Sequence, residues 1–201
     1  MFDNQINNFL SIPKKNIAVK LQYFGFSANF LTFISFNFSL LTFVFIIMGY
    51  FNFAIIFFIM SRISDGFDGE VARLNEVTQF GGYIDIVCDF LGYAIIPLGF
   101  IIYNQENSFA GALLLVSFIG TSSTFLTFAI YKKELNEKKI KKSFYYSYGL
   151  IEGFETIIFF ILILLFYEHF IFLTYFFSFL CFVTTLQRLL YAYYNLDQIN
   201  E

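Results

Sequence analysis

Long apolar stretches make up most of this chain, and short polar segments separate them. A transmembrane helix needs about 20 predominantly apolar residues, and most of the stretches approach this length. The pattern predicts an all-α membrane protein, a single membrane domain over residues 1–201 with six transmembrane helices. The predicted spans cover approximately residues 30–48, 53–74, 80–103, 109–131, 149–167 and 170–194.

The segment before the first span, residues 1–24, mixes polar and apolar residues. After Pro13, the apolar residues Ile17, Leu21 and Phe24 recur at helical spacing, and lysines occupy other positions. This pattern is typical of an amphipathic juxtamembrane helix that lies on the membrane surface. A solvated N-terminal helix is the alternative.

Composition and charge agree with a membrane protein. Hydrophobic residues make up 58% of the chain and charged residues 13%, whereas a soluble domain is about 25% charged. With six spans, both termini and the links between spans two and three and between spans four and five lie on one side of the membrane. All 12 Lys and Arg lie on that side or nearer to it. Positive charge marks the cytoplasmic side. We therefore expect an integral protein of the bacterial inner membrane, with the link between spans two and three facing the cytoplasm.

Four aspartates flank this link. Asp65 and Asp68 are spaced i, i+3, and Asp85 and Asp89 are spaced i, i+4, so each pair shares one helix face. A short link would make the two helices antiparallel and let the pairs converge. Carboxylates in apolar surroundings need a partner, and divalent cations such as Mg²⁺ prefer oxygen ligands. The pattern indicates a cation site, and two separate capping pairs are the simpler alternative. Arg62 is expected to pair with Asp65 across one turn.

The stretch D-G-F-D-G-E-V-A-R at residues 65–73, followed by Gly81, Asp85 and Asp89, resembles a known signature. That signature is D-x2-D-G-x2-A-R-x8-G-x3-D-x3-D, and it belongs to the class I CDP-alcohol phosphatidyltransferases. This chain has seven residues in place of the x8 segment, which shortens the link and removes no ligand. The stretch S-A-N-F-L-T at residues 27–32 resembles the family's T-P-N-x-L-T, with Ala28 in place of proline.

The resemblance implies transfer of a substituted phosphate group from a CDP-linked lipid donor, expected to be CDP-diacylglycerol, to the hydroxyl of a small alcohol. CMP would be released, in phospholipid biosynthesis. The resemblance also implies one or two Mg²⁺ or Mn²⁺ ions, contact with membrane lipids and a homodimer, and no nucleic-acid partner is expected. The implied metal ligands are Asp65, Asp68, Asp85 and Asp89, and Asp89 is also the implied catalytic base. The implied CDP-binding residues are Asn29, Thr32, Gly69, Ala72, Arg73 and Gly81.

Three more charged residues, Glu152, Glu155 and Arg188, are predicted at the same membrane depth as the aspartates. They either line a pocket for the acceptor alcohol or form a structural ion pair between the last two spans. A small transporter or channel with an acidic cation site is the main alternative function. The acids lie at one membrane face and no internal repeat is visible, and both observations disfavour it. A prenyltransferase-type enzyme would show D-D-x-x-D-type clusters.

Overall fold

The structure, a computed structural model, describes residues 14–74, 77–138 and 149–196. These residues form helices, and no strand occurs among them, which confirms the all-α prediction. Residues 1–13 of the predicted amphipathic segment lie outside the described part. After the helical residues 14–23, the α-helices are α2 (Ala28–Ile47), α3 (Phe51–Leu74), α4 (Gln79–Tyr103), α5 (Ser108–Lys138), α6 (Gly153–Leu165) and α7 (Phe170–Leu196). Two short 3₁₀ helices, η1 (Gln105–Asn107) and η2 (Tyr167–His169), precede α5 and α7.

Four of the described segments are long and apolar enough to cross a membrane. They are α2, α4, η1 with α5 as far as Tyr131, and η2 with α7 as far as Tyr194. The helix α3 has 24 residues but carries charged residues along its second half. The helix α6 has 13 residues. The prediction of six transmembrane helices therefore stays a prediction for α3 and α6.

The helix α6 is shorter than the span predicted over residues 149–167. The chain before it does not continue the helix, because the Ile151 N–H donates to Thr184 Oγ1 of α7 at 3.0 Å. Glu152 then caps the helix: its N–H donates to a carboxylate oxygen of Glu155 at 3.1 Å, and a reciprocal bond completes a capping box. Side-chain contacts with α7 thus fix where α6 begins.

A glycine ends α2 and turns the chain directly into α3. Gly49 has φ +75°, a conformation that favours glycine. Its N–H donates to the Ile46 carbonyl at 3.0 Å, and the Tyr50 N–H donates to the Phe45 carbonyl at 2.9 Å. These two bonds form a Schellman motif, which satisfies the last carbonyls of α2. The tight turn makes α2 and α3 antiparallel neighbours.

Contacts between helices connect α2, α3 and α4 with α5, α6 and α7. The helix α2 contacts α3 and α4, α4 contacts α5, α5 contacts α7, and α6 contacts α3. Hydroxyl groups bridge α2 and α3: Ser35 Oγ donates to the Ser61 carbonyl at 3.0 Å, and the Oγ atoms of Ser39 and Ser61 are 2.8 Å apart. Small polar residues and interhelical hydrogen bonds are typical of helix contacts in membranes.

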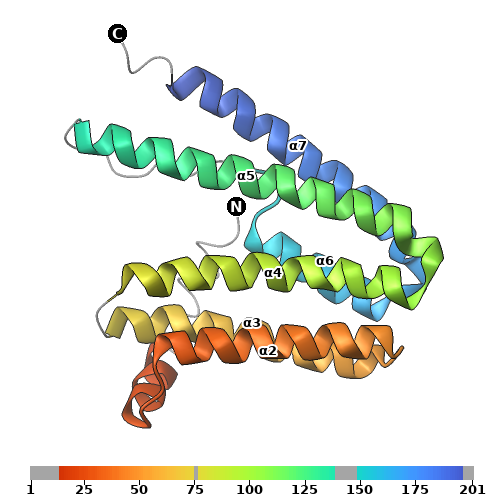
Figure 1. The fold of residues 1–201 in the computed structure, drawn as a ribbon, viewed down its shortest axis with the longest axis horizontal. Coiled ribbons are helices and arrows are strands. Elements are labelled where there is room, and N and C mark those ends of the chain that lie inside the picture. The colour runs from red at the N-terminus through yellow and green to blue at the C-terminus, as the bar shows by residue number, and fades with distance from the viewer. Residues whose placement is uncertain (1–13, 75–76, 139–148, 197–201) are drawn as a thin grey trace.

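Figure 1 shows which helix ends lie together. The C-terminal ends of α3, α5 and α7, the N-terminal end of α4 and the helical residues 14–23 lie at one end of the molecule. The α2–α3 turn and the links that contain η1 and η2 lie at the opposite end. The acidic residues of α3 and α4 are therefore near the first end.

Candidate active site

The antiparallel helices α3 and α4 bring three of the four aspartates together. One carboxylate oxygen each from Asp65, Asp68 and Asp85 lies within 4.8 Å of the other two. The spacing on each helix places two acids on one face, and the short link from Leu74 to Gln79 makes those faces meet. The convergence inferred from the sequence is therefore present in the fold.

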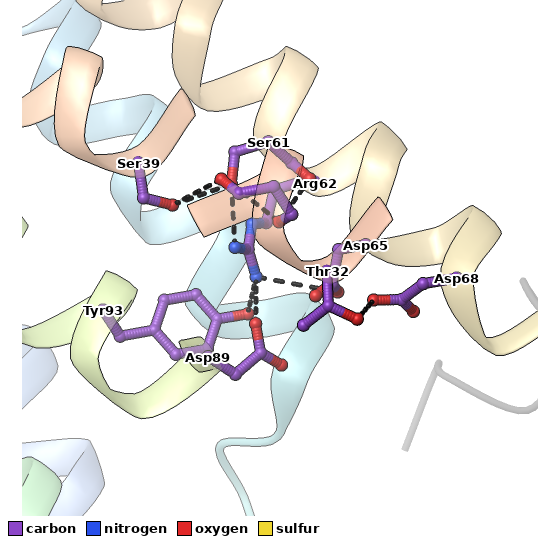
Figure 2. Close-up of polar contacts among 9 residues, drawn as sticks. Thr32, Ser39, Ser61, Arg62, Asp65, Asp68, Asp89 and Tyr93 are labelled. Carbon is purple, nitrogen blue, oxygen red and sulfur yellow. Dashed lines mark hydrogen bonds and ion pairs between the residues drawn. The ribbon is translucent and has the colours of Figure 1, made fainter. Parts of the chain in front are cut away.

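The helix α2 supplies a hydroxyl that orients one of these carboxylates. Thr32 Oγ1 donates to Asp68 Oδ2 at 2.7 Å, and both residues are buried (Figure 2). A hydrogen bond to a carboxylate is shorter and stronger than one between neutral groups. Ser27 begins α2 as its N-cap, because its Oγ accepts from the Phe30 N–H at 3.3 Å. The start of α2 thereby places Thr32 against α3.

The carboxylate cluster fits a divalent cation. Three carboxylates form a hard oxygen donor set, which suits Mg²⁺ or Mn²⁺. Mg²⁺ lies about 2.1 Å from each ligand, so opposite ligands are about 4.2 Å apart. Small side-chain rotations would close the observed separations, which reach 4.8 Å, around one ion. Without a cation, these three acids would repel one another.

The fourth aspartate, Asp89, contacts an arginine. Arg62 Nη1 lies 2.8 Å from Asp89 Oδ1 and 3.7 Å from Asp65 Oδ2 (Figure 2). The expected pair between Arg62 and Asp65 across one turn is therefore present, but it is the longer of the two contacts. The closer partner belongs to another helix, which the spacing along the sequence does not reveal.

A cavity of about 320 Å³ opens beside the aspartate cluster, between α2, α3 and α4. All six residues that the resemblance implies for CDP binding line this cavity. Those residues are Asn29, Thr32, Gly69, Ala72, Arg73 and Gly81. Asp68 and Asp85 also line it, so the cavity reaches the carboxylate cluster. Ser27 and Thr78, which the sequence reasoning missed as lining residues, are the N-caps of α2 and α4.

Glycine leaves room for two side chains where α4 approaches α2. A Cβ atom at Gly81 would lie 2.9 Å from both Asn29 Oδ1 and Thr78 Oγ1, closer than such contacts normally are. The Gly81 N–H donates to Thr78 Oγ1 at 3.0 Å, and this bond caps α4. At Gly69, by contrast, the nearest atoms to a Cβ atom would be those of the Arg73 guanidinium, at 3.7 Å or more. Both glycines therefore keep space open around the cavity.

Arg73 lies at the rim of the cavity. Its side chain is 64% exposed, and Nη2 donates to Glu70 Oε1 at 2.8 Å, three residues earlier on α3. An exposed ion pair of this kind contributes less than about 1 kcal/mol. The guanidinium is therefore available to an anionic ligand at little cost.

A second, larger cavity of about 860 Å³ lies among α4, α5, α6 and α7. Glu152 and Arg188 line it, together with Tyr93, which is one helical turn after Asp89. Glu155 is not among its lining residues and belongs to the capping box of α6. Arg188 Nη1 donates to the Thr121 carbonyl of α5 at 2.8 Å, so this arginine joins α7 to α5.

Comparison with known proteins identifies the family. The sequence profile of the family described as CDP-alcohol phosphatidyltransferase matches residues 26–187. This range contains the aspartates of α3 and α4 and every lining residue of the two cavities except Arg188. The chain therefore belongs to the CDP-alcohol phosphatidyltransferase family, as its motif indicated.

Two similar proteins extend this result. The chain is 40% identical over 181 residues to "Inner membrane protein YnjF" of Escherichia coli (strain K12), a match that covers 88% of each protein. Its fold resembles that of the crystal structure of Mycobacterium tuberculosis phosphatidylinositol phosphate synthase (PgsA1) with CDP-DAG bound. That match has a TM-score of 0.63 and 18% sequence identity, and covers 88% of this chain and 91% of the other. The structural likeness supports the fold.

Proposed function

We propose that this chain transfers a substituted phosphate group from CDP-diacylglycerol to the hydroxyl of a small alcohol and releases CMP. One observation carries the proposal: the cavity that the implied CDP-binding residues line also reaches the convergent aspartates. Membership of the family favours this reaction over a transporter or channel with an acidic cation site.

The smaller cavity is the proposed site for the CDP group. Asn29 and Thr32 line it from α2, Gly69 and Arg73 from α3, and Gly81 from α4. Arg73 would bind the pyrophosphate, because a guanidinium pairs well with phosphate oxygens. The small residues on α3 let the nucleotide approach the backbone. The related PgsA1 structure is described with CDP-DAG bound, which supports this type of donor.

Asp65, Asp68 and Asp85 are the proposed ligands of Mg²⁺ or Mn²⁺, with Asp89 beside them. A bound divalent cation would neutralise charge on the pyrophosphate and stabilise the departing CMP. Thr32 holds Asp68 in place by its hydrogen bond. The carboxylates would thereby position the pyrophosphate between the two cavities.

Asp89 is the proposed general base. The oxygen of the acceptor hydroxyl would form a bond to the phosphorus that carries diacylglycerol, while the bond from that phosphorus to the CMP oxygen breaks. The hydroxyl proton would pass to the Asp89 carboxylate, and CMP would leave with the bridging oxygen. This direct displacement needs no covalent enzyme intermediate. The sole histidine, His169, lies in η2 at the opposite end of the molecule (Figure 1).

The larger cavity is the proposed acceptor site. It borders Tyr93, close to the proposed base, and contains Glu152 and Arg188 as charged lining residues. Glu155 would support this site indirectly, since it fixes the start of α6 at Glu152. A hydroxyl-bearing acceptor in this cavity would approach the phosphorus from the side opposite the nucleotide.

We propose that the protein spans the bacterial inner membrane six times as a single domain over residues 1–201, with helix 14–23 on the cytoplasmic surface. The similarity to YnjF, which is named an inner membrane protein, supports this location. The active site would face the cytoplasm, where CDP-lipid and Mg²⁺ are available. A homodimer is proposed from the resemblance to the family.

CMP release tests the reaction directly. Purified protein in detergent would be incubated with CDP-diacylglycerol, Mg²⁺ or Mn²⁺ and a panel of alcohols. We expect metal-dependent CMP release with one class of alcohol and its loss in Asp89→Asn. Glu106→Gln, which changes an exposed carboxylate of η1 at the far end of the molecule, is the matched control and should keep full activity. Absence of both CMP release and CDP binding in folded protein would refute the proposal.

A further inference from the structure

Arg62 is a buried arginine on α3, outside the family signature. Its side chain is 8% exposed. Nη1 donates to Asp89 Oδ1 at 2.8 Å and to the Tyr93 hydroxyl at 3.0 Å, and Nη2 donates to Ser61 Oγ at 2.9 Å. The guanidinium carbon also lies 4.8 Å from the centre of the Tyr93 ring. Figure 2 shows the guanidinium between the first and the last aspartate of the signature.

The two acidic neighbours of Arg62 differ in their relation to the cation cluster. Asp65 belongs to the group of three carboxylates whose oxygens lie within 4.8 Å of one another, and Asp89 does not. Arg62 Nη1 is nevertheless closer to Asp89, at 2.8 Å, than to Asp65, at 3.7 Å. The arginine thus pairs most closely with the one aspartate that lies outside the cluster.

The position of the guanidinium matters because the guanidinium and a second metal ion would need the same space. A second divalent ion shared by Asp65 and Asp89 would need the space between their carboxylates, where the Arg62 nitrogen already lies. The arginine is also constrained on its other side, because Ser61 bonds to Ser39 of α2. A buried guanidinium that leaves its carboxylate partner would remain uncompensated, which is costly.

We propose that Arg62 is a positioning residue that holds Asp89 out of the cation site and replaces a second cation. The resemblance to the family implied Asp89 as a fourth metal ligand, whereas this arrangement assigns one divalent cation per chain to Asp65, Asp68 and Asp85. Asp89 is then held by Arg62 with its carboxylate fixed for the proton transfer. The role of Asp89 as base rests on the proposed function, but the cation count does not.

A Mn²⁺ titration of the purified protein in detergent, read by the electron paramagnetic resonance signal of free Mn²⁺, tests the cation count without turnover. We expect one tightly bound Mn²⁺ per wild-type chain, and unchanged binding in Asp89→Asn. In Arg62→Met, the released Asp89 carboxylate should bind a second Mn²⁺ or raise the affinity about tenfold. This gain should vanish in the double variant Arg62→Met with Asp89→Asn.

Other outcomes of the titration would overturn the proposal. Two Mn²⁺ per wild-type chain would do so, as would a loss of affinity in Asp89→Asn equal to the loss in Asp85→Asn. Unchanged binding in folded Arg62→Met would show that the arginine acts as a structural ion pair alone. Glu106→Gln, which changes an exposed carboxylate of η1 at the opposite end of the molecule, is the control and should bind Mn²⁺ as the wild type does. If Arg62→Met does not fold, the wild-type count and the Asp89→Asn titration still decide.

A kinetic measurement separates this proposal from the proposed function. Where CMP release is established, Arg62→Met should lower kcat about 10- to 100-fold and leave KM for CDP-diacylglycerol unchanged. The double variant should be no slower than Asp89→Asn, since residues that act through one group are not additive. Additive losses would contradict a role through Asp89. No CMP release by the wild type would count against the proposed function, while the Mn²⁺ count would stand on its own.

Discussion

At the scale of single residues, Gly81 of α4 lies directly against the side chain of Asn29 from α2. The space that a side chain would need is filled by Asn29 Oδ1 and Thr78 Oγ1, each 2.9 Å from the place of a Cβ atom. Both of these residues line the proposed CDP cavity. The next residue, Gly82, also lines the cavity, but a Cβ atom there would meet no atom within 4 Å.

These neighbouring glycines give a matched pair of variants. Gly81→Ala should displace Asn29 and the helix cap of Thr78, and should weaken CDP binding about tenfold, equivalent to roughly 1.4 kcal/mol. Gly82→Ala should leave binding unchanged, because its Cβ atom has room. Binding of CDP to purified protein, measured by calorimetry, checks both. Equal effects of the two variants would contradict the role assigned to the Gly81 contact.

The Thr32–Asp68 hydrogen bond supports a second prediction at this scale. Thr32→Val keeps the shape of the side chain but removes the donor at 2.7 Å from Asp68 Oδ2. The carboxylate would lose its orientation, and Mn²⁺ affinity should fall about tenfold, as is typical when a partner of a metal ligand is removed. The titration with Mn²⁺ measures this change.

Thr32→Ser is the control for this change, since it retains the hydroxyl and should keep most of the affinity. If Thr32→Val binds Mn²⁺ as tightly as the wild type, Asp68 does not depend on Thr32 for its position.

Sequence spacing predicted part of this site and missed another part for a physical reason. Residues three or four apart share a helix face, so the pairing of Asp65 with Asp68 and of Asp85 with Asp89 was readable. The partner of Arg62 was not, because Asp89 is 27 residues away and the contact depends on how α3 and α4 are aligned. The separation of Asp89 from the cation cluster is likewise a property of packing.

At the scale of elements, local residues set the ends of α2, α3 and α4, whereas a contact with a distant helix sets the start of α6. Hydrophobic runs and short polar links predicted the α3 and α4 bounds closely, because turns and caps there use local residues such as Gly49 and Thr78. The start of α6 depends on side chains of α7, since the Ile151 N–H bonds to Thr184. Periodicity does not reveal contacts between distant parts of the chain, so the sequence did not indicate that the helix itself begins at Gly153.

Thr184 is expected to matter for stability. Thr184→Val would leave the buried Ile151 N–H without its acceptor, at a cost of about 1–3 kcal/mol. For a protein of this size, 1 kcal/mol corresponds to about 2–4 °C in Tm. Thermal unfolding of the detergent-solubilised protein, followed by circular dichroism, measures the shift.

Thr185→Val is the matched control for this change. Thr185 Oγ1 donates to the Cys181 carbonyl within α7, and the helix retains that carbonyl's backbone bond when the hydroxyl is removed. A smaller decrease in Tm is expected for Thr185→Val. Equal decreases in the two variants would show that the bond to Ile151 does not anchor α6.

At the scale of the whole molecule, the proposed site and the basic residues lie at the same end. The C-terminal ends of α3 and α5, the N-terminal end of α4 and the helical residues 14–23 gather there (Figure 1). The opposite end holds η1 and η2 and, among the described residues, carries neither lysine nor arginine. This asymmetry favours an orientation with the site in the cytoplasm.

Length and composition alone do not identify α3 and α6 as membrane-crossing helices, so their crossing is the most direct test of the topology. With 13 residues, α6 is about 20 Å long at 1.5 Å per residue, shorter than the hydrocarbon core of about 30 Å. The extended residues before it and η2 after it would complete the crossing. Six spans then place Val77 in the cytoplasm and both Glu106 and His169 in the periplasm.

Cys88 and Cys181 would first be replaced by alanine, and a single cysteine would then be introduced at one of these three positions. Intact cells would be labelled with a membrane-impermeant maleimide that reaches the periplasm but not the cytoplasm. Glu106→Cys and His169→Cys should react, whereas Val77→Cys should react only after the inner membrane is opened. Labelling at Glu106 but not at His169 would mean that α6 does not cross, because α5 returns the chain to the cytoplasm and His169 would remain on that side. Labelling of Val77 in intact cells would reverse the orientation and place the CDP cavity on the side that lacks CDP-lipid, which would contradict the proposed function as well.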